Sequence, residues 1–150
     1  MAREHHYAAH VVWAGGSTAE AGYDRTFRVE IEGKPVFEGS ADPNFRGDPG
    51  KHNPEDLLLA SLAACHLLSY LALCQRAGIE VVRYEDQASG LMAIKDGKMR
   101  FTEVTLAPRV TIATGDVDKA TELHEAAHDL CFIANSVNFP VLTMPTVTRA

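Results

Sequence analysis

NPEDLLLASLAACH, residues 53–66, decides the fold, because it sets a cysteine inside an apolar helix. Asn53 is a good N-cap, and Pro54 suits the first helical position. The two acidic residues after Pro54 place negative charge at the positive end of the helix dipole. Gly78 is a typical C-terminal stop, so the sequence predicts a helix between Pro54 and Gly78.

This helix shows no clear polar face before Gln75 and Arg76. A helix that is apolar all round is normally buried in a protein core. We therefore expect it to be the central helix of the fold, covered on most sides. Leucine supplies much of its apolar surface, at Leu57, Leu58, Leu59, Leu62, Leu67, Leu68, Leu71 and Leu73.

Strand signals precede the helix. Residues 6–13 alternate loosely, and residues 25–31 form a second candidate strand. Residues 32–34, Glu-Gly-Lys, predict a tight turn, and residues 36–39 predict a third strand. The segment 40–52 is rich in Gly, Pro, Asp and Asn, which is typical of a loop, and binding residues often lie on loops.

Further strand signals follow the helix at residues 81–84, 91–94 and 100–106, and residues 109–112 extend the last of these past a proline. An Asp-Gly pair at residues 96–97 predicts a turn between the second and third segments. These segments predict another antiparallel sheet.

A second helix is then capped by either Asp116 or Asp118, and a Thr- and Val-rich terminal strand is expected at about residues 141–148. With 150 residues, the chain is long enough for one hydrophobic core and too short to divide comfortably into two. The prediction is one α+β domain over residues 1–150, with antiparallel sheets around a buried central helix.

The composition excludes several functional classes. A net charge of -6 gives no electrostatic reason to bind nucleic acid or an anionic membrane. We find no signal peptide and no run of consecutive apolar residues long enough to suggest a membrane span. We therefore expect a cytoplasmic protein. No Gly-rich phosphate loop suggests a nucleotide.

Three cysteines do not make a secreted disulfide framework, and in a reducing compartment such residues are more often catalytic or metal-binding. Cys65 lies in the central helix, and Cys131 lies near the end of the second helix. A thiolate that attacks a peroxide becomes a sulfenic acid, which a second thiol converts to a disulfide. Two cysteines are therefore enough for a self-contained cycle. Cys74, nine residues after Cys65, faces the opposite side of the helix and is expected in the core.

Cys65 needs a cation to favour its thiolate. It lies about 18 Å from the start of the helix, so the helix dipole offers little, and apolar surroundings disfavour the charged form. Arg46, in the loop before the helix, and Arg25, at the start of the second strand, are the two candidates.

The Asn-Pro-Glu opening at residues 53–55, the cysteine ten residues after Glu55, and the second cysteine in its helix resemble the OsmC/Ohr family of thiol-dependent hydroperoxide reductases. The resemblance implies an OsmC-like fold and an intertwined dimer. It also implies that Cys65 attacks the peroxide and that Cys131 resolves the sulfenic acid. An arginine that Glu55 positions is implied as well.

The activity that the resemblance implies is reduction of organic hydroperoxides to alcohols through a Cys65–Cys131 disulfide, without a bound cofactor. Its partners would be an organic hydroperoxide and a thiol or dithiol reductant. Arg46, slightly favoured, or Arg25 would stabilise the thiolate. The apolar helix flank favours a substrate with a hydrocarbon tail over hydrogen peroxide.

Helix geometry points to a homodimer. Glu55 and Cys65 are separated by about 15 Å along a straight helix, so one arginine cannot easily contact both within one chain. The glutamate and arginine serving Cys65 would then come from a second copy of the chain. A mostly apolar helix also needs more cover than one thin sheet provides.

Two alternatives stay open. His124, His128 and Cys131 lie on one helix face at positions i, i+4 and i+7, so the chain could be a non-catalytic metal- or small-ligand-binding module. The fold could also act on another electrophile, such as a disulfide. His66, directly after Cys65, departs from the family pattern, and the sequence assigns it no role.

Overall fold

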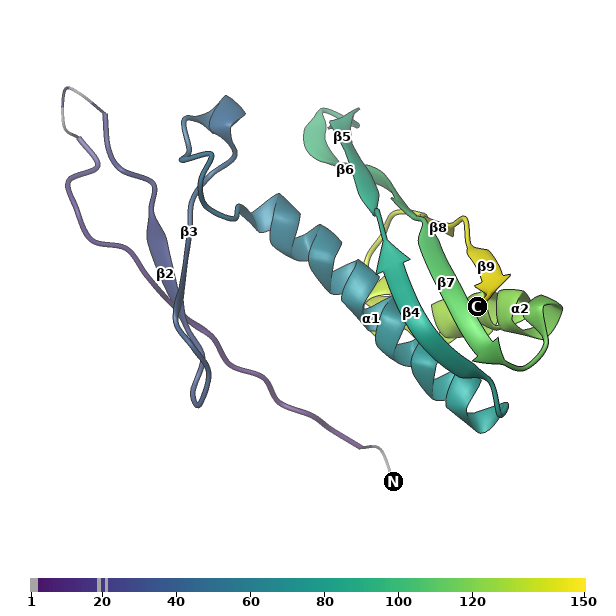
Figure 1. Cartoon of the computed structure of the whole chain (residues 1–150). Helices are drawn as coiled ribbons and strands as arrows, with labels where there is room; N and C mark the ends of the chain where they lie inside the picture. The colour runs from purple at the N-terminus through teal and green to yellow at the C-terminus, as the bar shows by residue number, and fades with distance from the viewer. Residues whose placement is uncertain (1–2, 19, 21) are drawn as a thin grey trace. The chain divides into compact units, whose positions relative to one another are not determined.

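The computed structural model describes residues 3–18, 20 and 22–150. The chain forms two compact units, residues 1–57 and residues 58–150 (Figure 1). Each unit has β-sheet structure of its own. The prediction of a single domain over residues 1–150 stays a prediction.

The first unit holds a three-stranded antiparallel sheet in the order β1-β2-β3. Strand β1 is His10–Val12, β2 is Phe27–Glu30 and β3 is Phe37–Gly39. The three predicted strands are confirmed at these places, although each is shorter than its sequence pattern. The predicted turn at residues 32–34 is confirmed as well, because the Lys34 N–H donates to the Ile31 carbonyl at 3.0 Å.

The central helix α1, Pro54–Arg76, begins and ends where the sequence predicts. At its start, the Asp56 N–H donates to Asn53 Oδ1 at 2.8 Å, and the Asn53 N–H donates to Asp56 Oδ2 at 3.2 Å. At its end, Gly78 has a φ of 70°, and the next N–H along the chain donates to the Cys74 carbonyl at 2.9 Å. Glycine adopts this left-handed conformation without strain. Local sequence therefore determines both ends.

The second unit contains two three-stranded sheets, in the orders β4-β7-β9 and β5-β6-β8. Strands β8 and β9 pair in parallel with β6 and β7. The predicted α+β class with antiparallel sheets is confirmed by the pairings β1-β2-β3, β4-β7 and β5-β6, and the two parallel pairings are an addition that the sequence did not predict. They arise because a chain that returns through a helix brings its next strand back in the same direction. The strands are Glu80–Asp86 (β4), Ser89–Lys95 (β5), Lys98–Leu106 (β6), Pro108–Thr114 (β7), Val141–Thr143 (β8) and Thr146–Arg149 (β9).

Two predicted strands are each divided between these sheets. The predicted extension of the strand past Pro108 is wrong, because the Ala107 N–H donates to Asp86 Oδ1 at 2.8 Å and Pro108 has no N–H to continue the ladder. The terminal strand expected at residues 141–148 is divided as well, into β8 and β9. The turn at residues 96–97 is confirmed, with positive φ at both residues, as a tight hairpin requires.

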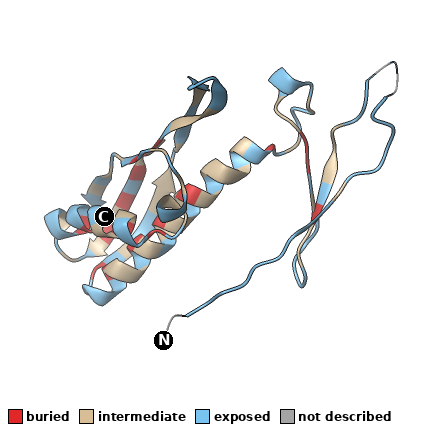
Figure 2. Cartoon of the chain, turned by 180° about the vertical axis from the view of Figure 1, so that it is seen from behind, coloured by how far each residue is buried: buried red, intermediate tan, exposed pale blue. Residues whose placement is uncertain are grey.

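The second helix, α2, spans Val117–Leu130, and Asp116 is its cap, since Asp116 Oδ1 accepts from the Lys119 N–H at 2.7 Å. Helix α1 buries one stripe at four-residue spacing (Figure 2): Leu62, His66, Tyr70 and Cys74. At the C-terminal end of this stripe, Tyr70 and Cys74 pack against β7 and α2. Nearer the start of α1, Leu62 packs against β6 and β8. These contacts form the core of the second unit.

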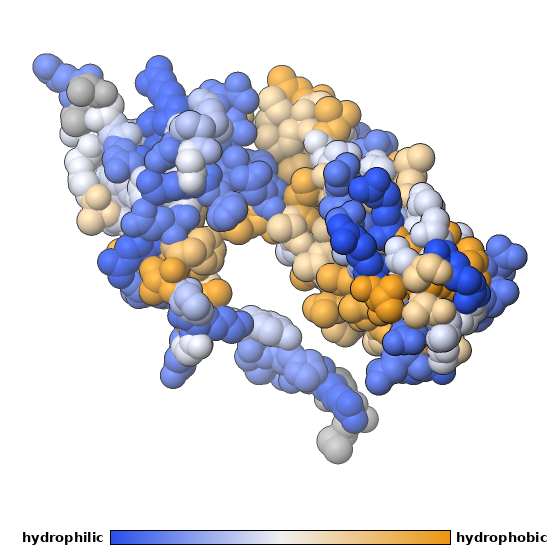
Figure 3. Space-filling view, in the orientation of Figure 1, coloured by the Kyte–Doolittle hydropathy of each residue, from blue (hydrophilic) through white to orange (hydrophobic). Residues whose placement is uncertain are grey.

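The expectation that α1 is covered on most sides is not met within one chain. Only 22% of the most apolar 18-residue stretch of α1 is buried inside the chain. Leu68, for example, is 66% exposed. By length and composition α1 is apolar enough to cross a membrane, a test that core helices also pass. Figure 3 shows hydrophobic residues on the surface of this unit. An exposed apolar face of this kind normally marks an interface.

Candidate active site

The structure brings Cys65 and Cys131 together. Cys65 lies in the middle of α1 and is partly exposed, whereas Cys131 is the C-cap of α2 and is 1% exposed. Burial raises the pKa of the Cys131 thiol, the Ala134 N–H lowers it, and the neighbouring Cys65 side chain raises it again. The Cys65 side chain is thus close enough to influence the ionisation of the Cys131 thiol, although the two residues are 66 positions apart in the chain.

The end of α2 holds the Cys131 thiol in place. Helix α2 stops at Leu130, and Cys131 takes an extended backbone conformation while its N–H donates to the His128 carbonyl at 3.2 Å. The chain then turns, so that the Ala134 N–H donates to Cys131 Sγ at 3.4 Å. A thiolate at Cys131 would keep this donor, and hydrogen bonding to the charged form favours it.

Cys74 does not belong to this pair. It is 1% exposed and lies in the core beside Tyr70. Burial raises the pKa of its thiol. Cys74 is therefore a core residue, as the helical spacing predicts.

A mostly apolar pocket of about 360 Å³ is lined by sequence neighbours of Cys65 and Cys131 and by Arg76, although neither cysteine is among its lining residues. From α1 it is lined by residues that follow Cys65 by three, four and seven positions, and these share its helix face. From the other side it is lined by Leu130 and Phe132, the two neighbours of Cys131. The pocket suits a hydrocarbon chain.

The two candidate arginines belong to the first unit. Arg46 ends a short 3-10 helix, Pro43–Phe45, with an unusual φ of 66°. Its guanidinium makes no hydrogen bond or ion pair with another residue in the described part of the chain. Arg25 differs, because its Nη1 donates to the Tyr23 carbonyl at 3.1 Å and its guanidinium lies 4.0 Å from the centre of the Tyr23 ring.

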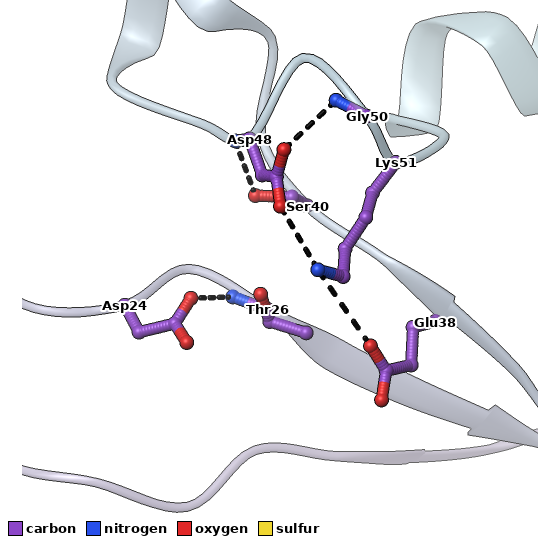
Figure 4. A network of polar contacts seen from close by, with 7 residues as sticks. All are labelled: Asp24, Thr26, Glu38, Ser40, Asp48, Gly50 and Lys51. Carbon is purple, nitrogen blue, oxygen red and sulfur yellow. Dashed lines mark hydrogen bonds and ion pairs between the residues drawn. The ribbon is translucent and has the colours of Figure 1, made fainter.

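Hydrogen bonds among Ser40, Asp48, Gly50 and Lys51 hold the loop that carries Arg46 (Figure 4). The Asp48 carboxylate accepts from the Gly50 N–H at 2.8 Å and from Lys51 Nζ at 2.9 Å, while the Asp48 N–H donates to Ser40 Oγ at 3.0 Å. The Ser40 N–H in turn donates to the His52 carbonyl at 2.9 Å. These hydrogen bonds fix the loop, and the fixed loop can hold Arg46 at its unusual positive φ.

Glu55, in the first turn of α1, has a buried Oε2 atom without a hydrogen-bond partner among the residues that the structure describes. A buried carboxylate oxygen normally has a donor. Glu55 therefore has capacity for an arginine, and no described arginine occupies it within the chain. The roles of Arg46, Arg25 and Glu55 stay predictions.

A histidine pair was not predicted from the sequence. His66 Nε2 and His124 Nδ1 lie 3.0 Å apart, and the His124 ring stacks on Tyr70 with 3.8 Å between ring centres. Burial lowers the pKa of both histidines to about 4, so both are neutral at pH 7. The sequence carried one signal for His66. It is four residues after Leu62 and four before Tyr70, so it shares the helix face that α1 buries.

The metal alternative gains no support. Within residues 3–18, 20 and 22–150, no three His, Cys, Asp or Glu side chains are grouped to hold a metal ion. Residues 124–128, His-Glu-Ala-Ala-His, match a zinc protease pattern. However, the His124 ring is stacked on Tyr70 and its Nδ1 is bonded to His66, so His124 and His128 form no metal-holding group with a third such side chain among the described residues.

The fold and the site define an α+β protein with two cysteines brought together from its two helices. The chain belongs to the OsmC-like protein family, whose family model matches residues 47–144. This match confirms the family that the Asn-Pro-Glu opening and the cysteine spacing predict.

Known proteins share the fold over nearly the whole chain. The OsmC-like protein VCA0330 of Vibrio cholerae, of unknown function, is 28% identical with a TM-score of 0.87, covering 95% of this chain and 100% of that one. An organic hydroperoxide resistance protein of Elizabethkingia anophelis is 22% identical with a TM-score of 0.72, and each chain is covered completely. The uncharacterized protein YmaD of Bacillus subtilis is 22% identical over 89% of this chain and 87% of its own length.

Proposed function

We propose that this protein is a thiol peroxidase that reduces organic hydroperoxides to alcohols. The observation that carries the proposal is the proximity of Cys65, on the exposed side of α1, to the buried Cys131 at the end of α2. Solved structures of the same fold include organic hydroperoxide resistance proteins, which supports this class of substrate.

The chemistry needs only the two thiols and an external reductant. The Cys65 thiolate attacks the distal peroxide oxygen, so an S–O bond forms, the O–O bond breaks, and the alkoxide takes a proton to leave as the alcohol. The Cys131 thiolate then attacks the Cys65 sulfenic acid, and a disulfide forms as water leaves. A dithiol reductant restores both thiols and is itself oxidised to a disulfide.

The mostly apolar pocket lined by sequence neighbours of the two cysteines supports a substrate with a hydrocarbon tail. Burial of such a tail contributes about 0.8 kcal/mol per CH₂ group, which hydrogen peroxide cannot gain. The expected preference is therefore for cumene hydroperoxide over hydrogen peroxide.

We also propose that two copies of the chain complete each site. Glu55 Oε2 lacks a partner in the described chain, and the apolar face of α1 is largely uncovered. A homodimer that covers this face and brings an arginine, Arg46 or Arg25, to Cys65 of the partner would satisfy both. Arg46 is favoured because its guanidinium is uncommitted among the described residues, whereas Arg25 is bonded to Tyr23.

A steady-state peroxidase assay with a dithiol reductant tests this function. Cys65→Ser should abolish the consumption of cumene hydroperoxide, because no other thiol occupies its position. Cys74→Ser is the matched control and should stay active, because Cys74 is a core residue. Full activity of Cys65→Ser, or no turnover of any hydroperoxide by the unaltered protein, would rule out the proposal.

A further inference from the structure

A pocket of about 430 Å³ is lined by the start of α1, by residues 98–101 of β6 and by residues 138–139, which lead into β8. Strand β8 pairs with β6 only at residues 104–106, so the earlier part of β6 has no neighbouring strand on that side among the described residues. All lining residues belong to the second unit, and none of them lines the pocket that we assign to the hydrocarbon tail of a peroxide. The proposed peroxidase cycle therefore gives this pocket no task.

Two cations in this pocket have no counter-charge. Lys98 and Arg100 both line it, and neither forms an ion pair with a described residue. No described Asp or Glu lines the pocket, although the chain has 20 acidic residues against 14 basic ones. A pocket of this charge favours an anion and disfavours a cation.

A hydrogen bond between Arg100 and Asn138 orients the donors of this pocket. Arg100 Nη2 donates to Asn138 Oδ1. Because a guanidinium can only donate, the amide oxygen must lie toward Arg100, and the NH₂ group of Asn138 keeps both of its N–H donors. The guanidinium itself has further N–H groups. Asn138 and Lys98 are exposed and Arg100 is half-buried, so a ligand can reach these side chains.

An aromatic pair gives the pocket an apolar wall. The ring centres of Phe101 and Phe139 are 5.7 Å apart, and their planes are inclined by 34°. Both residues are half-buried and pack against the core around Leu62, so the core holds them while part of their surface stays open to the pocket. A flat apolar group suits this wall, because contact between aromatic rings adds to the gain from burial.

We propose that this pocket binds a small aromatic carboxylate. The planar carboxylate accepts from the Arg100 guanidinium and from the Asn138 NH₂ group, Lys98 adds positive charge, and the aromatic ring lies against Phe101 and Phe139. The volume is within the range of small-molecule sites. This binding does not depend on the peroxidase proposal.

Chemical-shift titration of the ¹⁵N-labelled full chain at pH 7 tests the ligand class, because a carboxylic acid is ionised and an alkylamine is protonated at this pH. The probes are benzoate, benzamide, benzylammonium and acetate. Benzoate should bind at least about tenfold more tightly than each of the others, since benzamide lacks the charge, benzylammonium has the opposite charge and acetate lacks the ring. Equal binding of any of these three, or no binding of benzoate, would overturn the proposal.

Charge variants test the two cations. Arg100→Gln removes the guanidinium but keeps an NH₂ group for Asn138, and it should weaken benzoate binding about tenfold. Lys98→Met should weaken it about threefold, because an exposed ion pair contributes less. Lys95→Met is the matched control, since Lys95 lies opposite Lys98 in the β5-β6 hairpin but does not line the pocket. Unchanged binding in Arg100→Gln, or equal loss in Lys95→Met and Lys98→Met, would overturn the proposal.

Asn138 provides a readout that binding elsewhere on the surface would not move. Benzoate should shift the side-chain NH₂ signals of Asn138, with the same Kd as the backbone amides of residues 98–101. Asn138→Asp preserves the shape but adds a carboxylate that competes for Arg100, so benzoate binding should fall by more than about tenfold. Asn44→Asp, at an exposed position in the first unit, is the control and should bind benzoate unchanged. Unshifted Asn138 signals, or full benzoate binding by Asn138→Asp, would contradict the proposal.

Discussion

Cys131 differs from Cys65 in one decisive respect, which is access to a substrate. Its side chain is almost completely buried, whereas that of Cys65 is partly exposed. A peroxide can therefore reach Cys65 first, and Cys131 can react only with a sulfur that is already beside it. The order of events in the proposed cycle follows from this difference.

Cys131→Ser should therefore still react once with peroxide and stop. The Cys65 sulfenic acid should accumulate, because the hydroxyl of serine cannot displace water from it. Mass spectrometry after treatment with a sulfenic-acid trap should show one adduct per chain, on Cys65. An adduct on Cys74, or disulfide formation in this variant, would show that the cysteines have been assigned wrongly.

Arg46→Ala should slow the alkylation of Cys65 by iodoacetamide at neutral pH and move its onset to higher pH, because the thiolate loses its cation. Arg46→Lys should restore little, since an ammonium cannot bridge a thiolate and a carboxylate as a planar guanidinium does. Arg25→Ala is the comparison. If Arg25→Ala shifts the profile and Arg46→Ala leaves it unchanged, the role belongs to Arg25.

At the scale of the elements, the end of α1 depends on one backbone conformation. Gly78 has a φ of 70°, and a Cβ built there meets no other atom. Gly78→Ala should therefore cost about 1 kcal/mol of unfolding free energy from backbone strain alone. Urea denaturation measures this. Gly16→Ala, where φ is not positive and the space is also open, should change the free energy far less.

A hydrogen bond between two buried histidines, His66 and His124, links helices α1 and α2, and burial disfavours the protonated form of both. Burial lowers the pKa of His66 and His124 to about 4 from an ordinary value of 6.5, so the unfolded chain binds more protons between these limits. The free energy of unfolding should fall as the pH decreases from 6.5 to 4, by a few kcal/mol. His124→Gln should flatten this slope, and His5→Gln, at an exposed position, should preserve it. An unchanged slope in His124→Gln would contradict the assignment.

The elements differ in how far the sequence predicts them. Both ends of α1 were predictable, because Asn53 and Gly78 act on neighbouring residues. The division of residues 141–148 between two sheets was not predictable. The local pattern of apolar and polar residues does not reveal which distant strand each segment pairs with. The site follows the same rule. Helical spacing separated Cys65 from Cys74, whereas His66 and His124 meet across 58 residues, a contact that no local pattern encodes.

At the scale of the whole molecule, the proposed homodimer predicts complementation. Cys65→Ser and Glu55→Ala subunits should each be inactive alone, but a mixed dimer keeps one intact composite site. Random reassociation after refolding should recover about a quarter of the unaltered activity, since half of the dimers are mixed and each has one working site. No recovery despite demonstrated mixed dimers, or a fully active monomer by light scattering, would exclude composite sites.

The parallel pairing of β8 and β9 has a consequence for the time course of folding. Each of the two sheets receives its third strand from residues 141–149, which a ribosome makes after all the other strands. Neither sheet can therefore be completed while the earlier segments are still emerging, and contacts so distant along the chain form slowly. Until then the core that α1 forms with these sheets stays incomplete, so nascent chains should depend on a chaperone for longer than their size suggests.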